Sequence, residues 1–136
     1  MLKTRIIPVV LYRGGEAFKG RGFKSWRSTG SVVSAVKVHA RRGVDELLIL
    51  DIGATPNEKQ PDFELLRAIT ADLFTPLTFG GGIRTEEHFR LALANGADKV
   101  CLCTAALDSP DLINRAAHKF GSQAVTVSID VKLGKH

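Results

Sequence analysis

Apolar runs typical of strands and of helices alternate along the whole chain, and this alternation restricts the fold more than any other feature. Strand-like runs are predicted over residues 5–11, 46–52, 76–79, 99–104 and 124–130. Helix-like runs follow the first four strands, from Ser31 to Arg42 before Gly43, from near Pro61 to about Leu73, from the N-cap Thr85 to Gly96, and from the N-cap Ser109 to Gly121. Such alternation with short connections indicates parallel strands joined by right-handed crossovers. The expected fold class is therefore α/β, either an open doubly wound sheet or a (β/α)8 barrel.

The length of the chain limits how much of a barrel it can form. An eight-fold barrel typically needs about 250 residues, whereas this sequence has 136 residues and reaches only a fifth strand. We expect residues 1–136 to form one domain, the N-terminal half of a TIM-barrel-type (β/α)8 fold plus the fifth strand. In either architecture, functional groups lie at the carboxyl ends of the strands.

The sequence also argues against several classes of protein. No apolar stretch approaches the roughly 18 residues of a membrane span, and the N-terminus lacks a signal-peptide pattern. We therefore expect a cytoplasmic protein with no membrane partner. Cys101 and Cys103 lack the nearby histidine or second cysteine pair that a tetrahedral metal site needs. They are interpreted as small buried strand residues, and neither a metal nor a cofactor is expected.

The segment 12–30 is basic, aromatic and too long for a simple connection. It holds a large part of the positive charge in a chain of net charge +5, with five basic residues against the single acid Glu16, namely Arg13, Lys19, Arg21, Lys24 and Arg27. One interpretation is a mobile lid that closes Lys19 over a phosphorylated substrate. A second is a nucleic-acid-binding loop in which bases stack on aromatic rings, and a third is a disordered surface loop.

Three consecutive glycines in the stretch "TFGGGIRTEEH" separate a predicted strand from a predicted helix. Glycines at this position let backbone N–H groups approach an anion, and the helix dipole favours negative charge there. The alternative is a tight turn that needs positive φ, and composition alone does not separate the two. A second short loop, "CTAAL", places Thr104 at the equivalent height after the next strand.

Three charged residues lie near the starts of three predicted strands on one face, because side chains alternate with a period of two. They are Arg5, Glu46 and Lys99. One interpretation is a solvated ion-pair network that closes the bottom of a barrel, and the other is a polar gate to an interior passage. The residues alone favour the ion-pair network.

Two aspartates end predicted strands. Asp130 shares its face with Ser128 and Thr126, so it is expected to point inward at the functional end, where a carboxylate can act as a general acid or base. Asp51 follows the inward-facing Leu50 and is expected to support the neighbouring loops or to bind hydroxyl groups.

Several motifs together resemble the HisF family, the cyclase subunit of imidazole glycerol phosphate synthase. They are "RIIP", "KG" at 19–20, "DELLILDI" at 45–52, "TFGGGIR", "GADKV" at 96–100, "TAAL" at 104–107 and "FGSQAV…SIDVK" at 120–132. The resemblance covers the whole chain. It implies a (β/α)8 barrel that receives ammonia from a HisH-like glutaminase subunit docked on its N-terminal face and passes it to the active site at the opposite end.

The resemblance also implies roles for individual residues. The matching positions are an ammonia gate (Arg5, Glu46 and Lys99), one of two phosphate sites (Gly81, Gly82 and Thr104), the lid lysine (Lys19) and one of two catalytic aspartates (Asp130). Asp51 joins the expected substrate-binding residues, so the expected ligand is a phosphorylated small molecule.

The sequence departs from the family pattern at important positions. Leu11 stands where the family has its first catalytic aspartate, and Cys103 stands where it has a phosphate-binding asparagine. The second phosphate site and the fourth gate residue would lie beyond this sequence. Because leucine cannot transfer a proton, we expect cyclisation to be severely impaired.

Three functions follow as hypotheses. The first is a HisF-like amidotransferase subunit that delivers ammonia to a separate sugar-modifying enzyme, as HisF-like proteins do in surface-polysaccharide pathways. The second is the ordinary cyclase of histidine biosynthesis. The third is a non-enzymatic module that binds nucleic acid through segment 12–30. If the half-barrel were the whole product, its exposed inner face and strand edges would favour self-pairing.

Overall fold

The computed structural model describes residues 2–134. Seven strands form one sheet, and they are β1 (Val9–Arg13), β2 (Glu16–Arg21), β3 (Ser25–Ser31), β4 (Leu47–Asp51), β5 (Leu77–Gly80), β6 (Lys99–Leu102) and β7 (Val125–Val127). The strand order is β3-β2-β1-β4-β5-β6-β7. The run from β1 through β4, β5 and β6 to β7 is parallel throughout, as the alternating sequence predicted.

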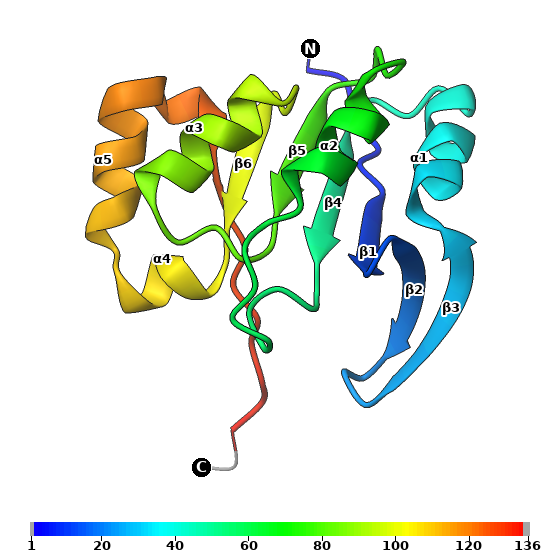
Figure 1. The fold of residues 1–136 in the computed structure, drawn as a ribbon, viewed down its shortest axis with the longest axis horizontal. Coiled ribbons are helices and arrows are strands. Elements are labelled where there is room, and N and C mark those ends of the chain that lie inside the picture. The colour runs from blue at the N-terminus through cyan, green and yellow to red at the C-terminus, as the bar shows by residue number, and fades with distance from the viewer. Residues whose placement is uncertain (1, 135–136) are drawn as a thin grey trace.

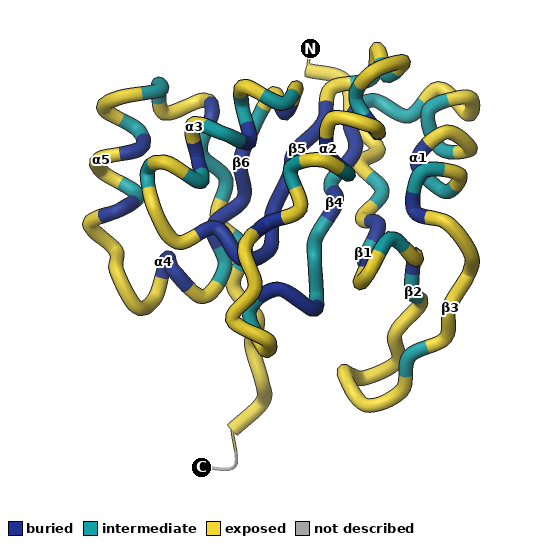
Figure 2. The backbone as a smooth tube through the Cα atoms, viewed as in Figure 1, coloured by how far each residue is buried: buried dark blue, intermediate teal, exposed yellow. Residues whose placement is uncertain are grey.

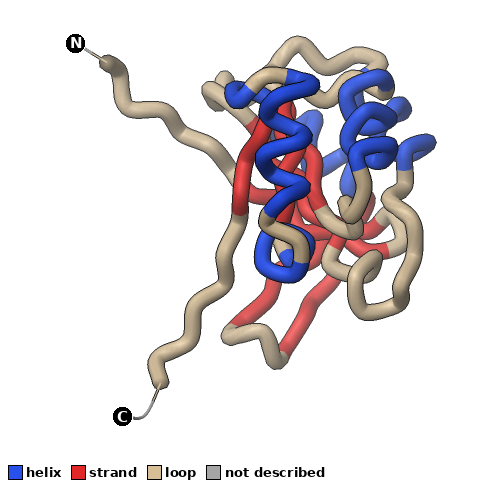
Figure 3. Tube along the Cα trace, turned by 90° about the vertical axis from the view of Figure 1, so that its left-hand side faces the viewer, coloured by secondary structure: helices blue, strands red, loops and turns tan. Residues whose placement is uncertain are grey.

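The helices lie on one side of this sheet. They are α1 (Val32–Arg41), α2 (Phe63–Thr70), α3 (Glu86–Ala94), the short α4 (Thr104–Asp108), α5 (Asp111–Phe120) and the 3₁₀-helix η1 (Ser122–Ala124). Figures 1 and 3 show them gathered on one side of the strands, with both terminal segments extending on the other side. The sheet does not close, so the architecture is an α/β partial barrel. No helix among residues 2–134 is long and apolar enough to cross a bilayer.

Alternation of side chains along the strands determines where the core sits. Leu47 and Ile49 of β4 and Phe79 of β5 are fully buried between the sheet and the helices. Residues of the opposite parity face the side without helices, where Leu48 is half-buried and Val9 is 52% exposed. Figure 2 shows the buried positions concentrated in β5 and β6 and the exposed ones in the β2–β3 hairpin and the C-terminal segment. The uncovered face is the one that would look into a closed barrel.

Helix ends follow the capping residues in the sequence. The Thr85 hydroxyl accepts a hydrogen bond from the His88 N–H at 3.1 Å, and the Asp62 carboxylate accepts one from the Leu65 N–H at 2.9 Å. Gly43 and Gly96 have positive φ just beyond α1 and α3, as a helix stop requires. The N-cap of α5 is Pro110 rather than the predicted Ser109, a shift of one residue.

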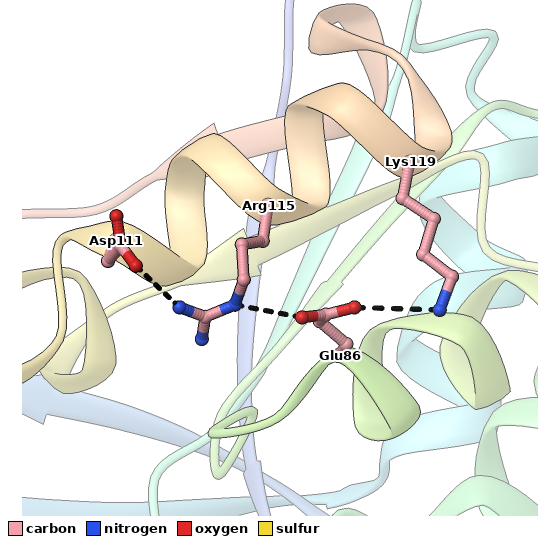
Figure 4. A network of polar contacts seen from close by, with 4 residues as sticks. All are labelled: Glu86, Asp111, Arg115 and Lys119. Carbon is pink, nitrogen blue, oxygen red and sulfur yellow. Dashed lines mark hydrogen bonds and ion pairs between the residues drawn. The ribbon is translucent and has the colours of Figure 1, made fainter.

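An ion-pair network joins α3 to α5 (Figure 4). The Arg115 guanidinium donates to Glu86 and to Asp111, each at 2.8 Å, and the Lys119 ammonium lies 3.5 Å from the other Glu86 oxygen. All four side chains are about one-third exposed or more. Exposed ion pairs typically contribute about 1 kcal/mol or less, so the network orients the two helices more than it stabilises them.

The expectation that segment 12–30 is a loop was wrong. The segment folds as an antiparallel hairpin, β2–β3, which continues the sheet beyond β1. Gly14 and Gly15 turn the chain with positive φ directly after β1, and Gly22 and Phe23 do the same at the hairpin tip. Backbone pairing therefore orders this segment, although most of its side chains are exposed. Because few of its side chains are buried, the sequence has no alternating apolar pattern from which these two strands could be predicted.

Three strands also differ from the prediction by two or more residues at an end. The first strand starts at Val9 rather than at residue 5, and it runs past Leu11 to Arg13 because β2 pairs with its last residues. The last strand ends at Val127 rather than at residue 130. The sixth strand, β6, ends at Leu102, and Thr104 is not in a loop but opens the short helix α4.

Candidate functional site

A cavity of about 390 Å³ lies where β5 and β6 end. It brings together Gly82 and Thr104, two of the residues that the sequence predicted for one phosphate site. The lining residues are Thr55, Glu58, Gly82, Ile83, Arg84, Cys103, Thr104, Ala105, Asp108 and Ser109. The cavity therefore lies at the carboxyl ends of parallel strands, where this class of fold places its ligands.

Glycine is required in the loop that follows β5. Gly81 has φ +100°, and a Cβ on it would lie 2.4 Å from the backbone oxygen of Asp51. Gly82 has φ +71°, and a Cβ there would lie 2.7 Å from the Ala54 side chain. The predicted turn with positive φ is confirmed, and the backbone also packs closely against the end of β4. Approach of the N–H groups to an anion stays a prediction.

The cavity has groups that suit a small anion. Arg84 supplies a cation and the hydroxyls of Thr104 and Ser109 supply donors on the lining. Glu58 and Asp108 also line the cavity. Their negative charges favour an anion position nearer to Arg84 than to either carboxylate.

Two thiols meet at the end of β6. Cys101 is fully buried, and Cys103 is half-buried on the cavity lining. A hydrogen bond from the Cys101 thiol lowers the pKa of Cys103 to about 7, assisted by the Ser128 hydroxyl and opposed by burial and by Asp130. The same hydrogen bond and burial raise the pKa of Cys101. The prediction of a buried strand residue is confirmed for Cys101, whereas Cys103 follows the strand and is only partly covered.

Asp51 supports the loop that follows β4. Its Oδ1 accepts hydrogen bonds from the N–H groups of Gly53 at 2.8 Å and Ala54 at 3.1 Å. Burial nevertheless raises the pKa of Asp51, and those two hydrogen bonds only partly offset the shift. Asp51 also lines a separate hollow of about 250 Å³ with Arg13 and Lys59. The predicted support of the neighbouring loop by Asp51 is therefore confirmed by these hydrogen bonds. Binding of a ligand hydroxyl by Asp51 stays a prediction.

The Tyr12 hydroxyl is the one buried side-chain polar atom without a hydrogen-bond partner among the described residues. Tyr12 is 1% exposed and packs in the core between the sheet and the helices. Burial raises the pKa of Tyr12, and the negative charges of Asp51 and Asp62 raise it further. The phenol therefore stays protonated and belongs to the core.

Arg5, Glu46 and Lys99 converge at the opposite ends of the strands. Glu46 is buried, and its carboxylate accepts hydrogen bonds from the Arg5 guanidinium and, at 3.0 Å, from the Lys99 ammonium. The Arg5 side chain is 60% exposed and that of Lys99 is 33% exposed. The prediction that these three charges lie together at the start of the strands is confirmed, although Arg5 itself precedes β1.

Residues 5–8 reach that cluster without being part of a strand. The Ile6 carbonyl accepts from the Asp45 N–H at 3.1 Å, and the Asp45 carboxylate accepts from the Ile6 N–H at 2.7 Å. These two bonds hold the extended chain beside the start of β4, and so place Arg5 against Glu46.

Lys19 and Asp130 lie outside the cavity that Gly82 and Thr104 line. Lys19 lies on β2, in a hollow of about 550 Å³ with Arg21, Trp26 and Arg27. Asp130 is exposed beyond β7 and lines a hollow of about 450 Å³ with Phe23 and Lys24 of the hairpin tip. The hairpin therefore meets the segment that carries Asp130, but the structure does not bring Lys19 to the cavity beside Gly82 and Thr104.

Trp26 is half-buried because it packs within the hairpin. A Cβ on Gly20 would lie 2.4 Å from the Trp26 ring, so the indole lies directly over this glycine. One ring face is therefore already covered by protein. This arrangement leaves less aromatic surface for base stacking than an open loop would.

Leu11 lies within the sheet between apolar neighbours. It pairs with Leu50 on β4 and with Phe18 on β2. The side chain is half-buried on the face without helices. The Leu11 side chain therefore packs against apolar neighbours and has no group that can transfer a proton.

Arg84 and Ser128 are functional candidates that the sequence prediction missed. Arg84 belongs to the quoted stretch "GGGIR", so its place directly after the glycines was the available signal. Ser128 was placed inward by parity, but its contact with the Cys103 sulfur depends on how β7 and β6 pair. No local pattern carries that information.

Comparison with known proteins agrees with this geometry. Residues 5–136 match the family described as histidine biosynthesis protein. Among curated relatives, a Campylobacter jejuni protein provisionally named imidazole glycerol phosphate synthase subunit hisF2 is 44% identical over 97% of this chain and 53% of its own length. Proteins named imidazole glycerol phosphate synthase subunit HisF are 43% identical in Chlorobaculum tepidum and 45% identical in an Exiguobacterium species, over 97% of this chain and 53% and 52% of theirs.

The chain spans about half the length of the curated relatives it matches. An open parallel sheet with helices on one face is what the first half of a barrel would form. From the match over residues 5–136 and the agreement with named HisF proteins, the chain belongs to the histidine biosynthesis protein family and is HisF-like within it.

Proposed function

We propose that the polypeptide carrying this sequence is a HisF-like subunit of a glutamine amidotransferase. A glutaminase subunit docks at the strand starts, and its ammonia passes between strands towards the carboxyl ends. A phosphorylated small molecule binds there, in the cavity beside Gly82 and Thr104.

The Glu46 cluster supports this proposal most strongly. A buried carboxylate held by two cations from different segments is a costly arrangement unless all its groups are satisfied. Its place at the strand starts suits a polar gate, because ammonia can exchange hydrogen bonds with a carboxylate and an ammonium group. The family resemblance assigns the same three residues to such a gate.

The cavity beside Gly82 provides the second part of the proposal. Backbone N–H groups of a glycine turn, the Arg84 guanidinium and the Thr104 hydroxyl are donors that phosphate accepts. Lys19 would reach the ligand only after movement of the β2–β3 hairpin, since it now lies in a separate hollow. In this proposal Asp51 holds the adjoining loop and contacts ligand hydroxyls.

Leu11 decides between cyclisation of the bound ligand and delivery of ammonia to another acceptor. Asp130 is an exposed carboxylate near the functional end, but Leu11 occupies the position where the family carries its partner. General acid–base cyclisation by two carboxylates is therefore impaired. We propose that ammonia is delivered to a separate acceptor, such as a sugar-modifying enzyme of a surface-polysaccharide pathway.

Stimulation of a glutaminase tests this proposal. Mixed with a HisH-type glutaminase, the polypeptide carrying this sequence should increase glutamine hydrolysis several-fold. Glu46→Ala should reduce that stimulation, because Arg5 and Lys99 lose their shared partner. Glu87→Ala is the matched control, since Glu87 pairs only with Arg90 among the described residues, on the exposed face of α3. Absence of stimulation by the unmodified protein would contradict the proposal.

A second function, the ordinary cyclase of histidine biosynthesis, is favoured by the relatives that carry the name HisF. In that case Asp130 alone would support residual turnover. The substitution Leu11→Asp separates the two functions, and Leu11→Asn is its isosteric control without a titratable group. A large rise in cyclase rate with aspartate but not with asparagine would indicate a damaged cyclase rather than a delivery subunit.

A further inference from the structure

The β2–β3 hairpin carries two arginines beside Lys19 that the proposed function does not use. Lys19 pairs directly with Arg27 across the hairpin, and Arg21 follows Lys19 by two residues on β2. Side chains alternate along a strand, and residues directly opposite each other share a face, so these three cations lie on one face of the hairpin. We call it the basic face. All three residues are exposed, and together they line a hollow of about 550 Å³.

No acid neutralises the basic face within residues 2–134. The ion pairs of this part of the chain include none of its three cations. Glu16, the one acid of the hairpin, lies at its far end and pairs with Ser31. Like charges directly opposite each other in an antiparallel pair are destabilising. An anionic partner would remove that cost.

The strand β3 also has an unpaired edge. It is the last strand of the sheet, with β2 on one side only. Apart from its ladder with β2, no backbone group of residues 25–28 is hydrogen-bonded to another part of the described chain. A bulge at Thr29 then interrupts the ladder, because the residues on either side of it pair with consecutive residues of β2. Residues 25–28 are therefore the regular part of this free edge.

Charge determines which strand can add to the free edge. A free edge accepts an extended segment through main-chain hydrogen bonds, and charged side chains on it oppose pairing with unsuitable strands. A second copy of β3 would bring a second Arg27 close to the cations already present. A segment with acids at every second position would instead present carboxylates about 7 Å apart on one face, which is also the spacing of Lys19 and Arg21 along β2.

We propose that the free edge of β3 binds an extended acidic segment of another protein. The backbone of that segment pairs with residues 25–28, and its alternate carboxylates contact the basic face. A strand added there lies about 5 Å from β3 and about 10 Å from β2. Arg27 therefore meets the carboxylates directly, and the long side chains of Lys19 and Arg21 reach them across β3.

The hairpin extends beyond the carboxyl ends of β4 and β5 (Figure 1). A partner bound to it would therefore dock at the end of the sheet that carries the cavity beside Gly82 and Thr104. The docking surface itself does not depend on the proposed function. Only the identification of this partner with the ammonia acceptor rests on it.

The arrangement of the hairpin favours an acidic peptide over a nucleic acid. Trp26 pairs with Gly20, and its ring lies over that glycine. Because neighbouring residues of a strand point to opposite faces, the Trp26 ring and the Arg27 guanidinium lie on different faces. Binding of a single nucleic-acid strand combines stacking on aromatic rings with contacts between cations and phosphates, which needs both groups on one face.

Peptides of defined pattern test the proposal. Fluorescence anisotropy at low ionic strength would measure binding of the full chain to a labelled peptide in which glutamate alternates with threonine. We expect saturable binding. A peptide of the same composition with its glutamates in one block should bind more weakly, and an N-methylated form of the alternating peptide should lose binding, because it cannot pair with the edge. Equal affinity for all three peptides would overturn the proposal.

Reversal of one charge locates the site. Arg27→Glu should weaken binding of the alternating peptide roughly tenfold, because an attraction becomes a repulsion. It should also create binding of a matched peptide with lysine in place of glutamate, a gain that misfolding cannot produce. Lys37→Glu, at an exposed position on α1, is the control with the same change in net charge and should leave both affinities unchanged. Equal effects of the two substitutions would contradict a site on the hairpin.

Two further outcomes separate the alternatives. If a single-stranded oligonucleotide binds the hairpin and the alternating peptide does not, the surface serves nucleic acid and the proposal fails. Neither measurement involves a glutaminase. Peptide binding without stimulation of a glutaminase would therefore support the docking surface while the proposed function fails, and stimulation without peptide binding would show the reverse.

Discussion

At Gly81, both the backbone conformation and the close packing of the chain require glycine. Its φ of +100° disfavours any side chain, and a Cβ would lie within 2.9 Å of three backbone atoms of Asp51. The loop that lines the cavity beside Thr104 can therefore approach β4 only through glycine.

The substitution Gly81→Ala should lower the free energy of unfolding by about 2 to 4 kcal/mol, since it adds a steric clash to a conformational cost. Gly14→Ala is the matched control, because Gly14 also has positive φ but a Cβ added there would meet no described atom within 4 Å. It should cost only about 1 kcal/mol. Urea denaturation of the two variants measures the difference, and equal losses would show that the contact with Asp51 is unimportant.

Asp51 should make stability depend on pH. Because burial raises its pKa in the folded state, the native protein holds the proton more tightly than the unfolded chain does. Stability should therefore fall as pH rises from the ordinary aspartate pKa, about 4, to the higher folded-state value. Asp51→Asn keeps an oxygen that can accept from Gly53 and Ala54 and should remove this fall.

Urea denaturation across a pH series measures the effect of Asp51→Asn. The expected result is a stability advantage for the variant that grows through that interval and is constant above it. Asp72→Asn, at an exposed position after α2, is the control and should track the unmodified chain. Parallel curves for the Asp51 variant and the unmodified chain would contradict the prediction.

Single residues were predictable from the sequence where strand periodicity alone places them. Glu46 and Lys99 converge as expected, because each lies at or beside a strand start with known parity, whereas Arg5 is placed against Glu46 by the bonds between Ile6 and Asp45 outside any strand. Lys19 was not predictable in the same way, since its position depends on a hairpin whose exposed residues give no apolar pattern. The contact between Ser128 and Cys103 needs the register between β6 and β7.

At the scale of elements, helix caps decide where secondary structure begins. Thr85 caps α3 with a side-chain hydrogen bond, whereas Ser31, at the equivalent position before α1, makes none. The sequence does not distinguish these two residues, because both are hydroxyl residues at a helix start. The difference lies in the geometry of the preceding chain, which is a tight loop before α3 and the end of β3 before α1.

Thr85→Ala should lower the free energy of unfolding by about 1 kcal/mol, because the His88 N–H loses its acceptor. Ser31→Ala should change it by no more than about 0.5 kcal/mol, as no cap bond is lost. Thermal or urea unfolding of both variants checks this contrast. A larger loss for the Ser31 variant would show that the difference in cap hydrogen bonding is not what matters.

Most of the parallel elements were predictable, and the antiparallel ones were not. Helices were marked by caps and glycine stops, and the parallel strands were short apolar runs between them. The hairpin is held instead by backbone pairing and two glycine turns. The short helix α4 was not predicted, because its five residues were interpreted as a loop.

At the scale of the whole molecule, two ends of one parallel sheet carry different chemistry. The strand starts hold a buried carboxylate between two cations, and the strand ends hold a glycine-lined cavity with a half-buried thiol of lowered pKa. Between them, the face without helices exposes apolar side chains such as Val9, at 52%. Self-pairing through this face stays a prediction, as does passage of ammonia along it.

Formation of imidazole glycerol phosphate from free ammonia is the sharpest test of the proposed loss of cyclisation. The polypeptide carrying this sequence would be assayed with the phosphorylated substrate and saturating ammonium, so that no glutaminase is needed. With Leu11 in place of a proton-transferring carboxylate, we expect no measurable cyclisation. Robust turnover by the unmodified protein would contradict this expectation and restore the ordinary cyclase as the better assignment.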